Sequence, residues 1–256
     1  MPDLGGRIRE LHALENLSSG GTAIHRLHPA SKILTAFVYI AVVASFGRYD
    51  FFRLAPYLFY PFVMMALAEL PYGVLLPRVL IALPFCLFAG VTNAIIENTA
   101  AFTAGGVTVS FGALSLATIL LKMYLCVMAA LLLVATTPFT DITAQLRRLR
   151  APVVFVISFE MTFRYIGVLL EEAYTMATAY RLRAGMRKAP DMRHMGSFAG
   201  QLLLRGFDRA ERVYAAMSCR GYSMRRVPPP RQSLRVRDAV AAAAVCVPAI
   251  VARAII

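Results

Sequence analysis

Long blocks of apolar residues divide this chain and restrict what it can fold into. The clearest block, Val79–Ile96, carries no charged side chain and is long enough to cross the apolar core of a bilayer as a helix. Hydrophobic residues make up 59% of the 256 positions, whereas a soluble domain of this size needs more polar surface to cover its core. The blocks therefore predict an all-α integral membrane protein.

The apolar blocks predict about five transmembrane helices. Pro56 and Pro61 interrupt the second, which a membrane helix tolerates where a neighbouring group satisfies the freed carbonyl. The loop before the fourth is predicted to contain an extended segment at Gly106–Phe111. The five blocks are Ser31–Phe46, Leu54–Leu70, Val79–Ile96, Gly112–Ala135 and Ala239–Ile256.

One polar segment, Pro138–Arg237, carries most of the charge. It holds 18 of the 27 basic and 7 of the 14 acidic residues, so it supplies +11 of the formal net charge of +13. A nucleic-acid-binding domain and a cytoplasmic loop both account for such charge, but spans on both sides favour the loop. Arg26 and Lys32 precede the first span and place the N-terminus inside as well. Four crossings then return the chain to the inside at Pro138, and the C-terminus is expected outside.

The chain is therefore predicted to have four parts. They are a cytoplasmic N-terminal segment, a four-helix membrane region, a cytoplasmic helical segment and a last membrane helix. These parts cover residues 1–30, 31–136, 137–237 and 238–256.

Two long amphipathic helices are predicted in the basic segment, at Pro152–Lys188 and Met195–Arg220. A short helix precedes them at Pro138–Leu149, with Thr137 as its N-cap. Apolar residues recur along both long helices at steps of three and four, which is typical of one apolar face. These residues include Phe155, Phe159 and Phe163 on the first helix, and Phe198, Leu202 and Met217 on the second.

Each long helix is predicted to end in an arginine beside a small residue. The two triplets are Leu182-Arg183-Ala184 and Cys219-Arg220-Gly221. Glycine after the last helical residue suits a left-handed C-cap, and a guanidinium offers a planar fork of donors to a partner's carboxylates or helix carbonyls. If only the position of these arginines near a bilayer is considered, lipid headgroups are their simpler partners.

The chain has no motif for catalysis or phosphate binding. It contains no Gly-Lys dipeptide, and neither HExxH nor GxSxG. A self-sufficient channel or carrier normally places several ionisable groups near the middle of the membrane. The predicted spans place one there, Lys122. Any energy for transport is therefore expected to come from a partner.

Several polar residues have more than one reading. Lys122 can pair with a helix carbonyl, pair with Glu160 or Glu171, or extend to the membrane interface. Glu171 and Glu172 are expected to pair with arginines of the same or the neighbouring helix. His25 and His28 lie three residues apart, but no carboxylate or cysteine lies close to them in sequence, so a structural role is favoured over a metal site.

At the two arginine triplets, Leu182-Arg183-Ala184 and Cys219-Arg220-Gly221, the chain resembles the T component of energy-coupling-factor (ECF) transporters. The resemblance is to the cobalt/nickel branch, the CbiQ family. The first triplet departs from that family's Ala-Arg-Gly pattern at both flanks, and the second departs at Cys219. The resemblance also rests on Ile24–Lys32, Thr136–Pro138, Phe163–Ile166, Leu169–Ala173 and Leu203–Tyr214.

The resemblance implies a non-catalytic, energy-coupling subunit of an ABC-type importer in the cell's inner membrane. Two partner ATPases would bind ATP and contact Arg183 and Arg220. Two crossed cytoplasmic coupling helices would pass the motion to a CbiM-like substrate-binding membrane subunit, beside a small accessory membrane subunit. The surface toward the substrate-binding subunit would include Phe155, Phe159, Phe163, Phe198, Leu202 and Met217.

The cargo implied by this resemblance is cobalt or nickel. The chain itself is expected to bind no cofactor, metal or nucleic acid, since ATP would bind to the partner subunits. The alternative is the T component of a vitamin transporter, and a more distant one is a self-sufficient channel or carrier.

Overall fold

The computed structural model is mainly helical and divides into two compact units. The bundle unit comprises Leu17–Pro138 and Gln232–Ile256, and the insert unit comprises Phe139–Arg231. The structure describes residues 20–22, 24–96, 100–104, 107–183, 192–223 and 236–255, so most of the predicted N-terminal segment lies outside the described residues.

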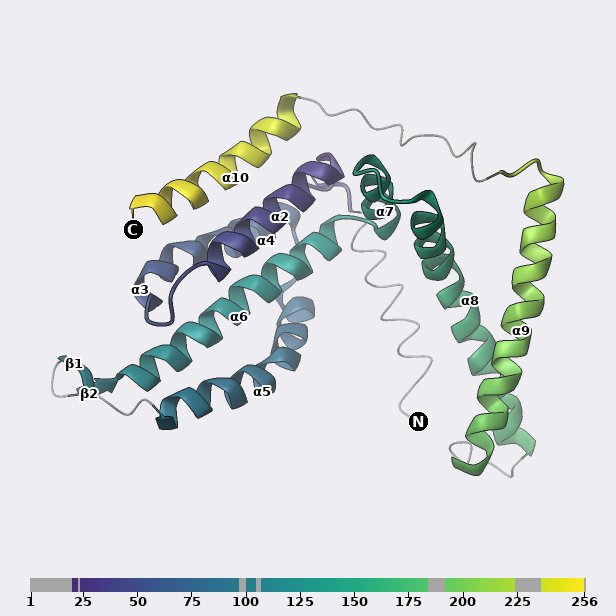
Figure 1. The fold of residues 1–256 in the computed structure, drawn as a ribbon, viewed down its shortest axis with the longest axis horizontal. Helices are drawn as coiled ribbons and strands as arrows, with labels where there is room; N and C mark the ends of the chain where they lie inside the picture. The colour runs from purple at the N-terminus through teal and green to yellow at the C-terminus, as the bar shows by residue number, and fades with distance from the viewer. Residues whose placement is uncertain are drawn as a thin grey trace. The chain divides into compact units, whose positions relative to one another are not determined.

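Helices of the bundle unit coincide with the five predicted spans (Figure 1). The second span is formed by two helices that a short 3-10 helix, η1 (Ala55–Leu58), joins. An antiparallel pair of strands, β1 (Ala100–Ala104) and β2 (Val107–Ser110), connects the third span to the fourth, where the extended segment was predicted. The helices are α2 (Pro29–Ala44), α3 (Phe51–Leu54), α4 (Phe59–Ala68), α5 (Tyr72–Ile96), α6 (Phe111–Thr136) and α10 (Val236–Ile255).

The prolines of the second span are accommodated as the sequence predicts. Pro56 lies in the first turn of η1, where its missing N–H costs no helical hydrogen bond. Pro61 lies inside α4 and cannot donate to the carbonyl of Tyr57, four residues earlier. The hydroxyl of Tyr39 on α2 donates to that carbonyl at 2.8 Å instead. The same carbonyl accepts from the Phe59 N–H at the end of η1, and the neighbouring helix supplies the second donor that the proline cannot.

The third span is longer than predicted. Helix α5 begins at Tyr72, not at Val79, and continues through Pro77 and Pro84. The uncharged block excluded the first turns because Arg78 lies within them. A long cationic side chain near a helix end can reach toward the membrane interface, so Arg78 does not have to end the span.

The ends of α2, α6 and α10 are tied together by hydrogen bonds. At the start of α2, the His28 amide donates to the Asp238 carboxylate of α10 at 3.0 Å, and Lys32 donates to the Thr136 carbonyl of α6 at 2.8 Å. At the other end of α2, the Arg253 guanidinium donates to the Ser45 carbonyl at 3.3 Å. Helix α10 therefore runs parallel to α2, and α6 runs antiparallel to both. The chain leaves the bundle unit after α6 and returns before α10 at the same end of the bundle.

By length and composition, four described helical segments can cross a membrane. They are Phe51–Ala68, Tyr72–Asn93, Phe111–Thr136 and Val153–Arg183. Helix α2 is apolar but shorter, with 16 residues, and α10 is not among the four. The last of the four belongs to the insert unit, so apolar length alone does not separate the two units.

The insert unit consists of α7 (Phe139–Arg148), α8 (Val153–Arg183) and α9 (Met192–Cys219). Helix α7 packs on α8 through a stacked pair of rings, Phe139 and Phe163, 4.2 Å apart, and through a 3.0 Å ion pair between Arg147 and Glu160. The prediction that Thr137 caps α7 is wrong. The helix begins at Phe139, and the buried Thr137 hydroxyl makes no hydrogen bond to any described residue.

Candidate functional site

The end of α9 forms a complete left-handed cap, as the sequence predicts. Gly221 has φ of 73°, a conformation that glycine adopts without the clash a Cβ would cause. Its N–H bonds to the Ser218 carbonyl, and the Tyr222 N–H bonds to the Met217 carbonyl, both at 3.0 Å. This pair of bonds is the Schellman motif. Arg220 stands between the last helical residue and the glycine, with its side chain exposed.

The end of α8 carries the other predicted arginine. Arg183 is the last residue of the helix and is exposed, and Leu182 beside it is 71% exposed. Ala184, the third member of that triplet, lies outside the described residues. An exposed arginine at a helix C-terminus also complements the negative end of the helix dipole, so both arginines occupy favourable places before any partner binds.

Helices α8 and α9 run antiparallel and contact each other over one part of their lengths. Arg205 of α9 forms an ion pair with Glu172 of α8, as expected for that glutamate. Nearby, Gly206 packs against Leu169: a Cβ added at Gly206 would lie 3.7 Å from a methyl carbon of Leu169, which is van der Waals contact. In Figure 1 the helices lie together near the α8–α9 connection and separate toward Val153 and Cys219. Helix α9 is about 42 Å long, so Arg183 and Arg220 lie near its opposite ends.

The predicted apolar stripes are exposed to different degrees. Phe155 and Phe159 on α8 are 63% and 52% exposed, whereas Phe163 packs against Phe139. On α9, Phe198, Leu202 and Met217 are half-buried. The largest exposed apolar side chains of α9 were missed as site candidates, although their spacing of three and four residues signals a second face. They are Leu203, Leu204 and Phe207. Tyr214, which is also exposed, belongs to the apolar face that the sequence predicts.

Lys122 binds helix carbonyls, the first of its alternatives. Its ammonium group donates to the Phe46 carbonyl and, at 3.4 Å, to the Ala44 carbonyl. These carbonyls are at the C-terminal end of α2, where no further helical N–H is available. The guanidinium of Arg253 lies over the Phe46 ring, 4.5 Å from its centre. Lys122 and Arg253 therefore cap the same helix end.

Two histidines just before α2, His25 and His28, have structural partners. His28 is the N-cap residue of α2, and its Nδ1 accepts a hydrogen bond from the Ala30 amide at 3.1 Å. His25 Nδ1 lies 2.6 Å from the Thr22 hydroxyl. Across the described residues, no group of three or more His, Cys, Asp or Glu side chains is placed to hold a metal ion.

These features define a mainly helical, multi-pass membrane protein with two long helices tipped by arginine. The family model described as CbiQ, cobalt transport protein, matches residues 20–232. Because that match covers most of the chain, this protein belongs to the CbiQ family.

Two curated relatives align with shorter parts of the chain. The cobalt transport protein CbiQ of Rhodobacter capsulatus is 34% identical over 91 residues, which are 35% of this chain and 37% of that protein. The nickel permease LarQ of Lactiplantibacillus plantarum is 31% identical over 88 residues, which are 34% of this chain and 32% of that protein. The chain thus aligns with about a third of the length of each relative.

Proposed function

We propose that this chain is the energy-coupling transmembrane subunit of an ECF-type importer for cobalt or nickel. The observation that carries the proposal is the pair of exposed arginines at the ends of α8 and α9, in a chain of the CbiQ family. The relatives named for cobalt and for nickel support a metal as cargo over a vitamin. The substrate metal would pass through a partner, and the chain itself would hydrolyse no ATP.

In the proposed mechanism, Arg183 and Arg220 enter grooves of two ABC-type ATPases. A guanidinium can bind carboxylates or exposed helix carbonyls with two parallel hydrogen bonds, which fixes direction as well as position. The cap at Gly221 makes the end of α9 rigid, so a displacement of Arg220 moves the helix and does not unwind it. Movement of the ATPases when ATP binds would thereby tilt α8 and α9 together.

The exposed apolar faces of α8 and α9 would contact the CbiM-like substrate-binding subunit. Phe155, Phe159, Phe207 and Tyr214 are each more than half exposed, and large exposed apolar surfaces mark interaction sites. A small accessory membrane subunit would complete the assembly. A displacement of the two helices under this surface would reorient the bound subunit.

We place the insert unit on the cytoplasmic side of the membrane. The predicted basic segment carries +11 of the net charge, and positive charge is retained inside. Helix α8 is apolar enough to cross a membrane, but its C-terminal half carries Glu171, Glu172, Arg181 and Arg183. Burying those charges in hydrocarbon costs several kcal/mol, which favours a position along the membrane surface.

Arg220→Glu tests this proposal. The variant is expected to insert and fold normally but to lose co-purification with the ATPase subunits, since reversal of a paired charge costs several kcal/mol at an interface. Cobalt and nickel uptake in cells carrying the complete transporter would fall to background. Arg164→Glu is the matched control, because Arg164 is an exposed arginine of α8 away from the end of that helix. Normal uptake and ATPase binding by Arg220→Glu would refute the proposal.

A further inference from the structure

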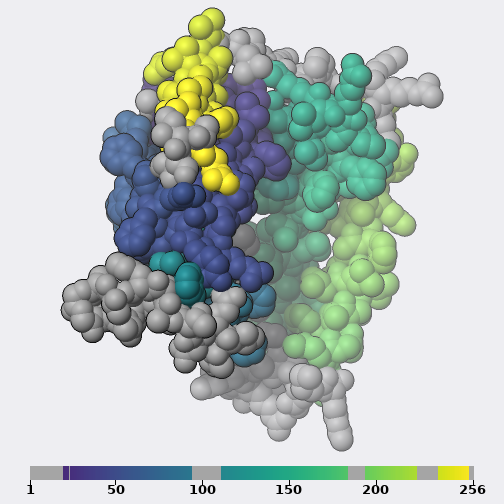
Figure 2. Space-filling model, turned by 60° about the vertical axis from the view of Figure 1, so that its left-hand side comes forward, coloured from purple at the N-terminus to yellow at the C-terminus, as the bar shows by residue number. Residues whose placement is uncertain are grey.

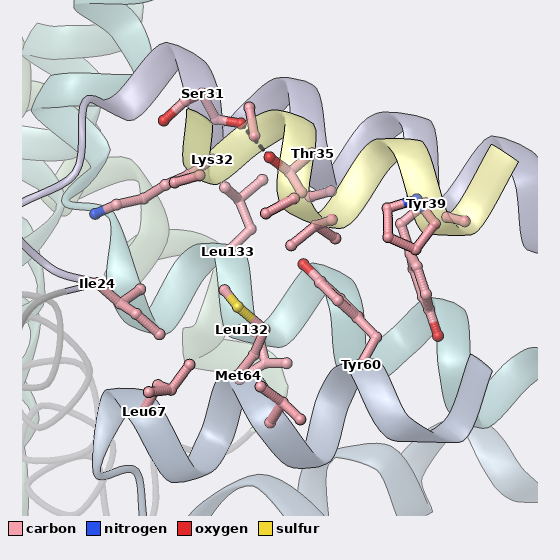
Figure 3. A pocket seen from close by; sticks show the side chains of 18 of the residues that line it. Ile24, Ser31, Lys32, Thr35, Tyr39, Tyr60, Met64, Leu67, Leu132 and Leu133 are labelled. Carbon is pink, nitrogen blue, oxygen red and sulfur yellow. Dashed lines mark hydrogen bonds between the residues drawn. The ribbon is translucent and has the colours of Figure 1, made fainter. Parts of the chain in front are cut away.

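A deep groove lies inside the bundle unit between α2, α4, α6 and α10 (Figure 3). Its volume is about 610 Å³, within the range of small-molecule sites in proteins. Figure 3 shows Met64 and Leu67 of α4 and Leu132 and Leu133 of α6 along it. In Figure 2, α10 lies at the surface beside α2 and α3, so one wall of the groove is a single peripheral helix.

Most hydroxyl groups that line the groove donate to carbonyls of its own walls. The Tyr39 hydroxyl donates to the Tyr57 carbonyl, and the Tyr57 hydroxyl donates to the Ala249 carbonyl, both at 2.8 Å. The Thr136 hydroxyl donates to the Leu132 carbonyl at 2.7 Å. Because most of the donors are engaged, a polar occupant would find few partners for its own groups. The walls therefore favour a hydrocarbon chain.

One end of the groove is basic. Arg237 lies one helical turn before Ala241 and so on the side of α10 that lines the groove. Arg26 stands between two lining residues, Ile24 and Leu27. The bond from the His28 amide to Asp238 holds the two segments at the same end of the bundle. Arg26 and Arg237 are both exposed, and neither makes an ion pair with a described residue.

We propose that this groove binds one anionic phospholipid from the leaflet that meets this end of the bundle. An acyl chain would lie between α10, α2 and α4, and the phosphate would lie at Arg26 and Arg237. Basic sites between membrane helices recognise anionic headgroups by this combination. A zwitterionic lipid or a partner's helix would account for the apolar walls but not for two exposed arginines at their end. The site is independent of the proposed transport role.

Native mass spectrometry of the purified full-length chain tests the site. Dioleoyl phosphatidylglycerol and dioleoyl phosphatidylcholine, which differ in charge but not in acyl chains, are titrated in detergent. We expect one phosphatidylglycerol bound about thirtyfold more tightly than phosphatidylcholine, since each basic contact adds roughly fivefold. Arg26→Gln with Arg237→Gln should make the two lipids bind equally. The control, Arg48→Gln with Arg53→Gln, removes the same charge at the opposite end of α2 and should keep the preference.

A second pair of variants tests the hydrocarbon part. Ala242 lines the groove and its neighbour Ala243 does not. Ala242→Phe is expected to reduce binding of both lipids at least tenfold, and Ala243→Phe to leave it unchanged.

Three results would overturn the proposal: equal binding of the two lipids to the unmodified chain, a preference that survives loss of Arg26 and Arg237, or displacement of the lipid when a membrane partner assembles with the chain. The last result would identify a partner's helix as the occupant. Since each result reads lipid binding directly, none of them depends on coupling to ATPases.

Discussion

Individual side chains complete the backbone hydrogen bonding of the bundle unit. In hydrocarbon no water is available to satisfy a carbonyl, so groups left open by a proline or a helix end need a protein donor. Each donor here is a long or phenolic side chain from a neighbouring helix. The pairs are Tyr39 with Tyr57, Lys32 with Thr136, Lys122 with Phe46, and Arg253 with Ser45.

Tyr39→Phe is expected to lower the free energy of unfolding by about 0.5–1.5 kcal/mol, the net contribution of one hydrogen bond, since the Phe59 N–H still bonds the Tyr57 carbonyl. The ring would remain in place, since it is 1% exposed and stacks on Tyr60 at 4.2 Å. The change should be measured as a lower thermal denaturation midpoint of the purified chain in detergent.

Pro61→Ala provides the matching test, because alanine restores the N–H that normally bonds the Tyr57 carbonyl. In the Pro61→Ala background, Tyr39→Phe should cost much less than in the natural chain. Equal costs in both backgrounds, as judged by a double-mutant cycle, would show that the Tyr39 hydroxyl does not act through this carbonyl.

At the scale of the elements, a small contact sets the relative position of α8 and α9. Their described contacts include the ion pair of Glu172 with Arg205, the approach of Gly206 to Leu169, and the rings of Tyr180 and His194 at 6.1 Å. Both partners of the ion pair are partly exposed, so the pair contributes only about 0.2–1 kcal/mol. Its larger consequence is geometric, since it fixes where along their lengths two 28- to 31-residue helices meet.

Glu172→Arg is expected to separate the two helices. It replaces an anion by a cation in a cluster that already holds three arginines and one aspartate of α9, so the helices would repel each other. These residues are Arg205, Asp208, Arg209 and Arg212. Spin labels on the exposed Thr175 of α8 and Ser197 of α9 should then show a longer and broader distance distribution.

The charge swap Glu172→Arg with Arg205→Glu should restore the original distance. Glu211→Arg, at an exposed position of α9, is the control for added positive charge and should change nothing. A distance that stays unchanged in the single Glu172→Arg variant would show that this ion pair does not position the helices.

At the scale of the whole molecule, the parallel arrangement of α2 and α10 determines the topology. Both helices start at the end of the bundle where α6 finishes. If the N-terminus is inside, as the charge distribution predicts, both ends of the insert unit are inside and the C-terminus is outside.

Reporter fusions in cells check this topology. Alkaline phosphatase fused after Ile256 should be active, and the same enzyme fused at position 190 should be inactive; a green fluorescent protein at the two positions should give the opposite pattern. Active phosphatase at position 190 would instead place α8 across the membrane, consistent with its apolar composition.

Much of this architecture could be predicted from the sequence. Apolar length located the helices of the bundle unit, since a span needs a minimum number of apolar residues. The glycine after Arg220 predicted the left-handed cap, because that conformation strongly favours a residue without a Cβ. Both are local properties, which a short stretch of sequence determines by itself.

The tertiary structure alone decided the partners of the polar residues. Three alternatives for Lys122 were open from sequence, and the carbonyls that it binds lie 76 and 78 residues away along the chain. The groove beside α10 is likewise formed by four helices from distant parts of the sequence. The sequence determines which segments must be helical and apolar, because that depends on each segment's own composition; which groups meet depends on how the helices pack.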